Sequence, residues 1–181
     1  MASYVVRPVT MIEESPGLED RGARVAVASG AAFKENNLVT VGADGARDVT
    51  AGDNASLAFV AEPAVNRAYK AAGVDYANTK SHVEVQYIGG KSIAITLTGA
   101  YAAADIGTQV GVAVDASGYV VADKAQANKI GTIRGVYGNQ VVQSGNNVFL
   151  QDNVADGDTN VYVIVEVDPA VALPASAAGG I

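Results

Sequence analysis

Residues 82–98 constrain the fold most, because their apolar side chains recur at every second position. The alternation runs over 82–87, breaks at Gly89-Gly90 and resumes over 92–98. Its apolar positions are Val83, Val85, Tyr87, Ile93, Ile95 and Leu97. A period of two is the pattern of a strand with one buried face. We therefore predict a β-hairpin that turns at Gly89-Gly90.

The composition of the whole chain favours the same kind of structure. Hydrophobic residues make up 49% of the 181 residues, but they are mostly Ala and Val, and there are 20 Gly and no Trp. Such a chain favours short strands and tight turns over helix bundles. Further strands are predicted at 25–27, 38–41, 57–60, 110–114, 119–121, 130–137, 141–143, 147–150 and 160–167. The predicted fold class is all-β, as a small β-barrel or β-sandwich.

One segment is a helix candidate within this β-rich chain. Pro63 suits a first helical turn, the alanines of 63–74 give a partial apolar face, and Gly73 can end a helix. The β-rich domain is expected to span 25–167, as one body or as two small modules over about 25–75 and 82–167.

The two ends of the chain differ from the domain in composition. Residues 1–24 are interpreted as an extended N-terminal arm, because their second half is polar and broken by Pro16 and Gly17. The arm is either a frayed terminus or a segment that becomes ordered on a neighbouring subunit. Residues 168–181 are rich in Ala, Pro and Gly, and we expect a flexible C-terminal tail.

Two pieces of the chain, 31–61 and 103–136, resemble each other in outline. Each has a strand, an Asp-to-Gly turn, a polar stretch and a further strand. A weak duplication would produce this likeness. Strand and turn chemistry recurs in any small β protein, however, and this simpler interpretation is slightly favoured.

The charge pattern limits the partners that the chain is expected to bind. The net charge is −7, and the 12 Lys and Arg residues are scattered singly. Binding to phosphate backbones or anionic membranes needs clustered basic residues. We expect no nucleic-acid and no membrane partner. Met1–Thr10 shows no signal-peptide pattern, so synthesis in the cytoplasm is expected.

The lone histidine and a glycine-rich run are the first candidates for chemistry. There is no Cys, which leaves no thiol nucleophile and no thiolate ligand. His82 is predicted to lie on the solvated face of its strand rather than to act as a base. Gly89-Gly90-Lys91-Ser92 resembles the end of a phosphate-binding loop, but Val85 stands where that motif needs Gly, and a strand follows.

The carboxylates form no predicted site either. Asp152–Asp158 has acids beside a Gly, as calcium loops do, but the spacing fails and Val154 occupies a ligand position. Glu13-Glu14 and Glu19-Asp20 lie in the arm, whereas a glycosidase pair needs rigidly held carboxyls. We expect no catalytic, cofactor-binding or metal site, and a protein that is not an enzyme.

Several runs resemble the β modules of bacteriophage head decoration (capsid cement) proteins. The runs are 31–41, Ala43-Asp44-Gly45, 57–61, 104–136 and 161–165. The resemblance is compositional, covers roughly residues 25–167, and brings no catalytic residues with it. It implies a β-barrel or β-sandwich that binds the major capsid protein on the outer surface of a virion, often as a trimer. It also implies a terminal arm that clamps neighbours, but it identifies no capsid-binding residue.

Two other classes of function remain as alternatives. A carbohydrate- or receptor-binding β module of a phage head fibre usually exposes aromatic platforms, and this chain has 8 Tyr but no Trp. An enzyme on a β scaffold is the least favoured, because the chain has one His, no Cys and no catalytic motif.

Overall fold

The computed structural model describes residues 3–4, 8–13, 22–71, 74–137, 140–144, 147–151 and 154–171. In these residues the regular elements are strands and two 3-10 helices, η1 (Ala103–Asp105) and η2 (Pro169–Val171). The predicted all-β fold is confirmed. Most strands belong to one sheet of five strands and one of six.

The five-stranded sheet has the order β3-β9-β6-β4-β5, and all its neighbours are antiparallel. Its strands are β3 (Gly22–Ala26), β4 (Asn37–Gly42), β5 (Gly45–Asp48), β6 (Leu57–Val60) and β9 (His82–Tyr87). Just after β3, Val27 forms a parallel bridge with Ala46 of β5. The N–H of Ala28 also donates to the carbonyl of Ala46 at 2.9 Å. The sheet therefore curls until its two outer strands meet.

The six-stranded sheet has the order β12-β11-β13-β16-β10-β2. Its strands are β2 (Thr10–Glu13), β10 (Ser92–Thr96), β11 (Gln109–Val114), β12 (Val120–Asp123), β13 (Gly131–Val136) and β16 (Tyr162–Val167). Just after β10, Leu97 forms a parallel bridge with Ala122 of β12. The N–H of Thr98 donates to the carbonyl of Ala122 at 2.8 Å. This sheet closes in the same way as the first.

The two sheets repeat one topology, which defines a first unit (residues 22–87) and a second unit (residues 92–167). Without β2, the order β10-β16-β13-β11-β12 matches β3-β9-β6-β4-β5 strand for strand. The register also matches, since β3 lies opposite residues 86–82 of β9 and β10 lies opposite residues 166–162 of β16. The likeness of 31–61 to 103–136 thus accompanies a repeated arrangement of strands, contrary to the simpler interpretation favoured from sequence.

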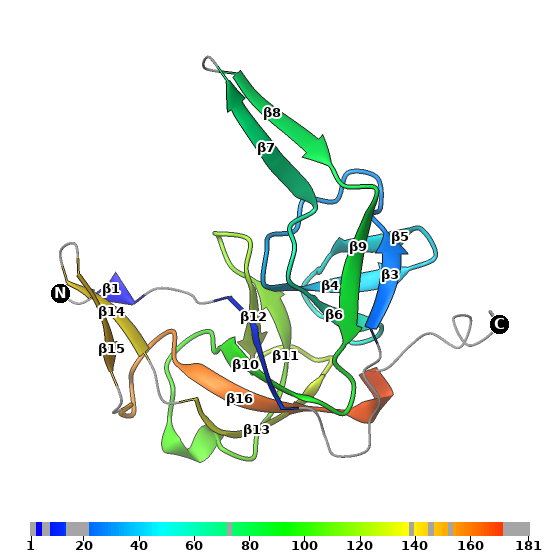
Figure 1. Cartoon of the computed structure of the whole chain (residues 1–181). Coiled ribbons are helices and arrows are strands. Elements are labelled where there is room, and N and C mark those ends of the chain that lie inside the picture. The colour runs from blue at the N-terminus through cyan, green and yellow to red at the C-terminus, as the bar shows by residue number, and fades with distance from the viewer. Residues whose placement is uncertain are drawn as a thin grey trace.

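Each unit carries a hairpin between its fourth and its last strand. In the first unit this hairpin is β7 (Val65–Ala71) with β8 (Val74–Thr79), and in the second it is β14 (Gln140–Ser144) with β15 (Asn147–Gln151). In Figure 1, β7–β8 projects far beyond the body, and β14–β15 lies on another side. The short strand β1 (Ser3–Tyr4) pairs with the outer side of β14.

The helix predicted at 63–74 is wrong, because β7 occupies most of that segment. Val and Tyr favour extended backbone, and the chain returns through β8, so that Tyr69 stands opposite Tyr76. A partial alanine face is a weaker signal than pairing with a neighbouring strand, which here extends over both strands with one shift of register between Arg67 and Tyr69.

The alternation over 82–98 marks two strands correctly, but the predicted hairpin is wrong. β9 pairs with β3 and β6, whereas β10 pairs with β16 and β2. Gly89-Gly90 instead joins the first unit to the second, and the N–H of Gly90 donates to the carbonyl of Val167 at 3.1 Å. A period of two reports which face of a strand is buried, but not which strand lies beside it.

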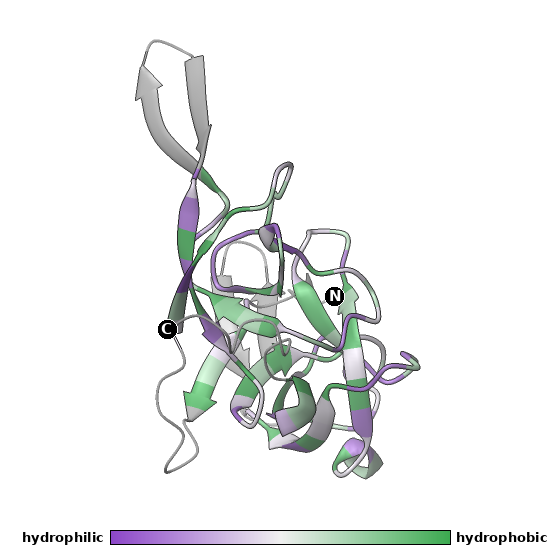
Figure 2. Cartoon of the chain, turned by 90° about the vertical axis from the view of Figure 1, so that its right-hand side faces the viewer, coloured by the Kyte–Doolittle hydropathy of each residue, from purple (hydrophilic) through white to green (hydrophobic). Residues whose placement is uncertain are grey.

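The apolar residues form a large core and a smaller one. The larger core fills the second unit and extends to Leu38, Val49 and Leu57 of the first unit and to Ile88 in the link between the units. The smaller core lies inside the first unit and includes Phe33, Val60 and other buried residues. Figure 2 shows the hydrophobic residues gathered on strands and many hydrophilic ones on the loops. Residues of both units share the larger core, which holds the units together.

The described parts of the predicted arm lie against the rest of the chain. Val9 is 2% exposed, and the hydroxyl of Tyr162 donates to the carbonyl of Pro8 at 2.7 Å. β2 pairs with β10, and residues 22–24 begin β3. Of the other residues of 1–24, Ser3–Tyr4 form β1, and the remainder lie outside the described residues.

The first residues of the predicted C-terminal tail, 168–171, lie against the larger core. η2 follows β16, and Val171 is 2% exposed within the larger core. The N–H of Val171 donates to the carbonyl of Asp168 at 3.0 Å. One apolar side chain thus anchors this segment, and residues 172–181 lie outside the described part.

Candidate functional site

The hairpin β7–β8 is the most prominent candidate for binding another molecule. It projects from the first unit (Figure 1), and its two strands pair only with each other in the described part of the chain. Both long sides of the hairpin therefore present main-chain groups that another strand can pair with. The hairpin of the second unit differs, because β1 already covers one side of β14.

The two units are held in a fixed relation by a buried amide. Asn37 at the start of β4 is 2% exposed. Its Oδ1 accepts from the N–H of Val120 at 2.9 Å, and its Nδ2 donates to the carbonyl of Gly118 at 3.1 Å. Lys34 lies over the ring of Tyr119, 4.7 Å from its centroid. These contacts fix the β11–β12 turn against the first unit.

A second joint between the units is built around Asp53. Its Oδ2 accepts from the hydroxyl of Thr40 at 2.8 Å, from the N–H of Thr50 at 3.0 Å and from Arg47 Nη1 at 3.2 Å. Burial raises the pKa of Asp53, but these hydrogen bonds and the Arg47 charge together lower it below its ordinary value. The loop that Asp53 shapes reaches the second unit.

The contact of that loop is made by the backbone of Gly52. Its N–H donates to the carbonyl of Val112 at 2.9 Å, and its carbonyl accepts from Asn128 Nδ2 at 2.9 Å. The Asp53 network therefore helps to hold the two units together. The Asp53 carboxylate already accepts hydrogen bonds from Thr40, Thr50 and Arg47, so its role here is structural.

A similar network surrounds Asp105 in the second unit. Its Oδ2 accepts from the N–H of Ala102 at 2.8 Å and from Lys124 Nζ at 2.8 Å. Burial raises the pKa of Asp105, but these hydrogen bonds and the Lys124 charge lower it below its ordinary value. Burial, followed by the charges of Asp156 and Asp105, raises the pKa of Tyr101. The pairing of Asp105 with Lys124 stabilises η1 and leaves neither group as an evident acid or base.

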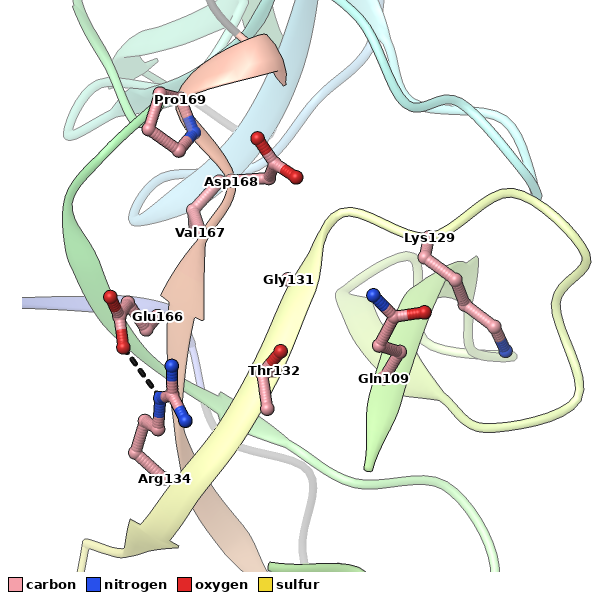
Figure 3. Close-up of a pocket in the computed structure, with 9 residues that line it drawn as sticks. All are labelled: Gln109, Lys129, Gly131, Thr132, Arg134, Glu166, Val167, Asp168 and Pro169. Carbon is pink, nitrogen blue, oxygen red and sulfur yellow. Dashed lines mark hydrogen bonds and ion pairs between the residues drawn. The ribbon is translucent and has the colours of Figure 1, made fainter. Parts of the chain in front are cut away.

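A polar groove of about 210 Å³ lies across β11, β13 and β16 (Figure 3). Its polar lining comes from Gln109, Lys129, Thr132, Arg134, Glu166 and Asp168. Arg134 Nε lies 2.5 Å from Glu166 Oε2, and both side chains are more than half exposed. The groove offers hydrogen-bonding groups of both charges to a small polar ligand.

The residues singled out from the sequence are dispersed. His82 is exposed on β9, with its Nδ1 at 3.3 Å from Ser81 Oγ, as expected of a solvated side chain. Lys91 is 2% exposed between the two units, and Ser92 begins β10. A strand therefore follows the Gly-Gly-Lys-Ser run, where a phosphate-binding loop requires a helix.

The acidic candidates are also separate. Asp156 Oδ1 accepts from the N–H of Ala103 at 2.7 Å, and Asp158 Oδ2 accepts from the N–H of Ala155 at 2.9 Å. Glu13 ends β2, whereas Glu14, Glu19-Asp20 and Asp152 lie outside the described residues. Among the residues that the structure describes, no group of three His, Cys, Asp or Glu side chains is arranged to hold a metal.

The sequence analysis missed the projecting hairpin, because its first strand falls in the predicted helix. The signal that was available is the pair of Val- and Tyr-containing runs at 65–71 and 74–79. Within the described part of the chain, no helix has the length and apolar content of a membrane span. No family model, curated protein or solved structure matches this chain.

Proposed function

We propose that this chain is a non-enzymatic structural protein that binds the outside of a phage capsid and stabilises it. The observation that carries the proposal is the pair of hairpins, which extend from equivalent places in two firmly joined units (Figure 1). A protein that fastens neighbouring subunits needs separate contact elements on one stiff body. The hairpins meet that need, and the sequence resembles capsid cement proteins.

The stiffness of the body supports the same function. Asn37 and Gly52 hydrogen-bond across the two units, and the larger core includes residues from both. When one contact forms, a rigid body holds the second contact element close to its target at a high effective concentration. Two modest contacts can then hold a subunit that neither would hold alone.

The proposed partner is the major capsid protein, and the proposed location is the outer surface of the virion. A homo-oligomer, with a trimer favoured, fits the symmetric positions of such a shell. The net charge of −7 keeps free subunits soluble and away from nucleic acid, and no membrane partner is proposed.

Density-gradient sedimentation of lysate from the producing culture tests this function. We expect the protein to travel with shell-sized particles at a fixed ratio to a major coat protein. A variant in which residues 66–78 are replaced by a short Gly-rich turn is expected to leave the particles while its body stays folded. Replacing the exposed Ala43-Asp44 turn by Asn-Gly is the matched control. If the unaltered protein stays at the top of the gradient while intact particles sediment, the proposal fails.

The polar groove of Figure 3 favours a second candidate, a carbohydrate- or receptor-binding module. Its amide, hydroxyl and carboxylate groups can hydrogen-bond sugar hydroxyls. The residues that line it include no aromatic ring for a sugar to pack against, which makes this the weaker proposal. The measurement is binding to a glycan array. Binding by the unaltered protein and by the Asp44→Ala control, together with loss of binding by the Gln109→Ala variant, would support this candidate.

A further inference from the structure

The first strands of the two units differ in what lies beside them. β10 has β16 on one side and, at residues 92–94, β2 on the other, whereas β3 has β9 on one side and, at residues 22–24, no described strand on the other. Just beyond these residues each strand meets the far strand of its sheet, since Val27 bridges Ala46 and Leu97 bridges Ala122. In β10, Ile93 and Ile95 are 0% exposed. Ala23 and Val25 hold the equivalent places in β3 and are only half-buried, although they pack on the smaller core.

The strand β2, in the N-terminal arm, shows which side chains fit the outer edge of a first strand. In the second unit Met11 stands opposite Ile93 and Thr10 stands opposite Ala94. Met11 also packs on the larger core, so the added strand contributes apolar side chains as well as main-chain hydrogen bonds. At the equivalent places of β3, the residues are Ala23, which faces the core, and Arg24, which is exposed.

We propose that the outer edge of residues 22–24 in β3 binds an extended strand of a partner protein, in the place that β2 takes on residues 92–94 of β10. The strand that fits has an apolar side chain opposite Ala23, as Met11 lies opposite Ile93, because Ala23 faces the smaller core. Its alternate side chains are polar, because Arg24 and its cross-strand neighbour Glu84 are exposed on the other face. Such pairing combines main-chain hydrogen bonds with pockets for every second side chain.

The chain's own arm does not serve this edge, because it is bound to the second unit. The hydroxyl of Tyr162 lies 2.6 Å from Thr10 Oγ1, and the N–H of Val9 donates to the carbonyl of Asn36 at 3.0 Å. Moving β2 to β3 would uncover Ile93 and gain no strand pairing overall. No other described segment lies on this edge, so we assign it to a strand of another molecule, whether or not that molecule belongs to a capsid.

The direct test adds a labelled peptide with the sequence of residues 6–14 to the full-length protein. The peptide has the alternation that fits β10, and the chain's own arm occupies that site, which leaves β3 to bind it. We expect saturable binding by fluorescence anisotropy and slower amide exchange at 22–26. Two control peptides carry N-methyl groups on alternate residues. Only alternate N–H groups of a bound peptide face the edge. The peptide whose methyl groups replace the outward-facing N–H hydrogens should keep its affinity, and the peptide whose methyl groups replace the edge-facing ones should bind about tenfold more weakly or worse.

A substitution pair locates the site on the protein. Val25→Lys places a charge on the inward face of the edge strand and should abolish peptide binding, whereas Glu84→Lys on the exposed face of β9 should preserve it. If Val25→Lys does not fold, the N-methylated peptides still decide the question. Three results would overturn the proposal: no saturable binding at millimolar peptide, protection at 92–96 in place of 22–26, or a dimer of this chain that the peptide dissociates. The dimer would show that a second copy fills the edge.

Discussion

At residues 92–94 the first strand of the second unit lies between two neighbours, whereas at residues 22–24 the equivalent strand of the first unit has one described neighbour. β10 accordingly buries Ile93 and Ile95 completely, whereas β3 leaves Ala23 and Val25 half-buried. The two strands pair with their last strands in the same register. The comparison shows that one topology gives two different environments, because β10 faces the larger core and carries the added strand β2, whereas β3 faces the smaller core. Four predictions test how far the two units are alike.

The largest expected effect concerns the closure of the first unit. Gly45 has a φ of +112°, and a Cβ added there would lie 2.2 Å from the carbonyl oxygen of Ala26. We expect Gly45→Ala to cost roughly 2–6 kcal/mol of stability, from backbone strain and from the clash. Gly42→Ala in the same turn is the control, because nothing lies within 4 Å of its added Cβ. Chemical denaturation measures both, and equal effects would show that β5 does not close against β3.

The next effect compares equivalent side chains in the two units. Ile95→Ala removes a fully buried side chain and should cost about 2–5 kcal/mol. Val25→Ala removes a smaller, half-buried side chain and should cost about 1 kcal/mol or less. Urea denaturation of both variants gives the two values. A Val25→Ala cost as large as that of Ile95→Ala would mean that β3 is covered in the free protein.

The joint between the units should show a smaller effect. Asn37→Ala leaves the buried N–H of Val120 without its acceptor and should cost about 1–3 kcal/mol. Asn128→Ala removes an exposed hydrogen bond to Gly52 in the second joint and should cost less, about 1 kcal/mol or less. Thermal unfolding followed by calorimetry should also show a broader transition for Asn37→Ala, as the units uncouple. An unchanged transition would place the coupling in the apolar core alone.

The smallest effect is the dependence of stability on low pH, which we expect in both units. Asp53 in the first unit and Asp105 in the second each have a pKa lowered from 3.8 in the folded protein. Each ionised group therefore contributes stability above pH 3.8, and this contribution is lost as the pH falls through the lower folded value. Asp53→Asn and Asp105→Asn should each flatten the loss of stability between pH 4 and 2 (roughly the range of these groups). Stability measured against pH by urea denaturation checks this.

The strands were predictable because their signals are local. The alternation at 82–87 and 92–96 and the β-branched run at 160–167 all correspond to strands of the structure. The partners of those strands were not predictable. Whether β10 pairs with β9 or with β16 depends on residues more than sixty positions away, and Gly89-Gly90 suits a hairpin turn as well as a link between units.

The candidate binding elements were less accessible to sequence reasoning. β7 was hidden by alanines that suit a helix, and its identity depends on the returning strand β8. Whether the edge of β3 is open depends on which strands pair with it, and the sequence of residues 22–26 alone does not show this. The likeness of 31–61 to 103–136 was visible, but only the matched strand order distinguishes a repeat from recurring turn chemistry.

Native-state amide hydrogen exchange of the free protein tests the central difference between the units most directly. We predict that the amides of residues 92–94 in β10 are all protected, because both sides of the strand are paired there. In β3 the protection should alternate, with slow exchange only at the N–H groups that point toward β9. Uniform protection of β3 at a concentration where the protein is monomeric would contradict the account, because another part of the chain would then already cover its edge.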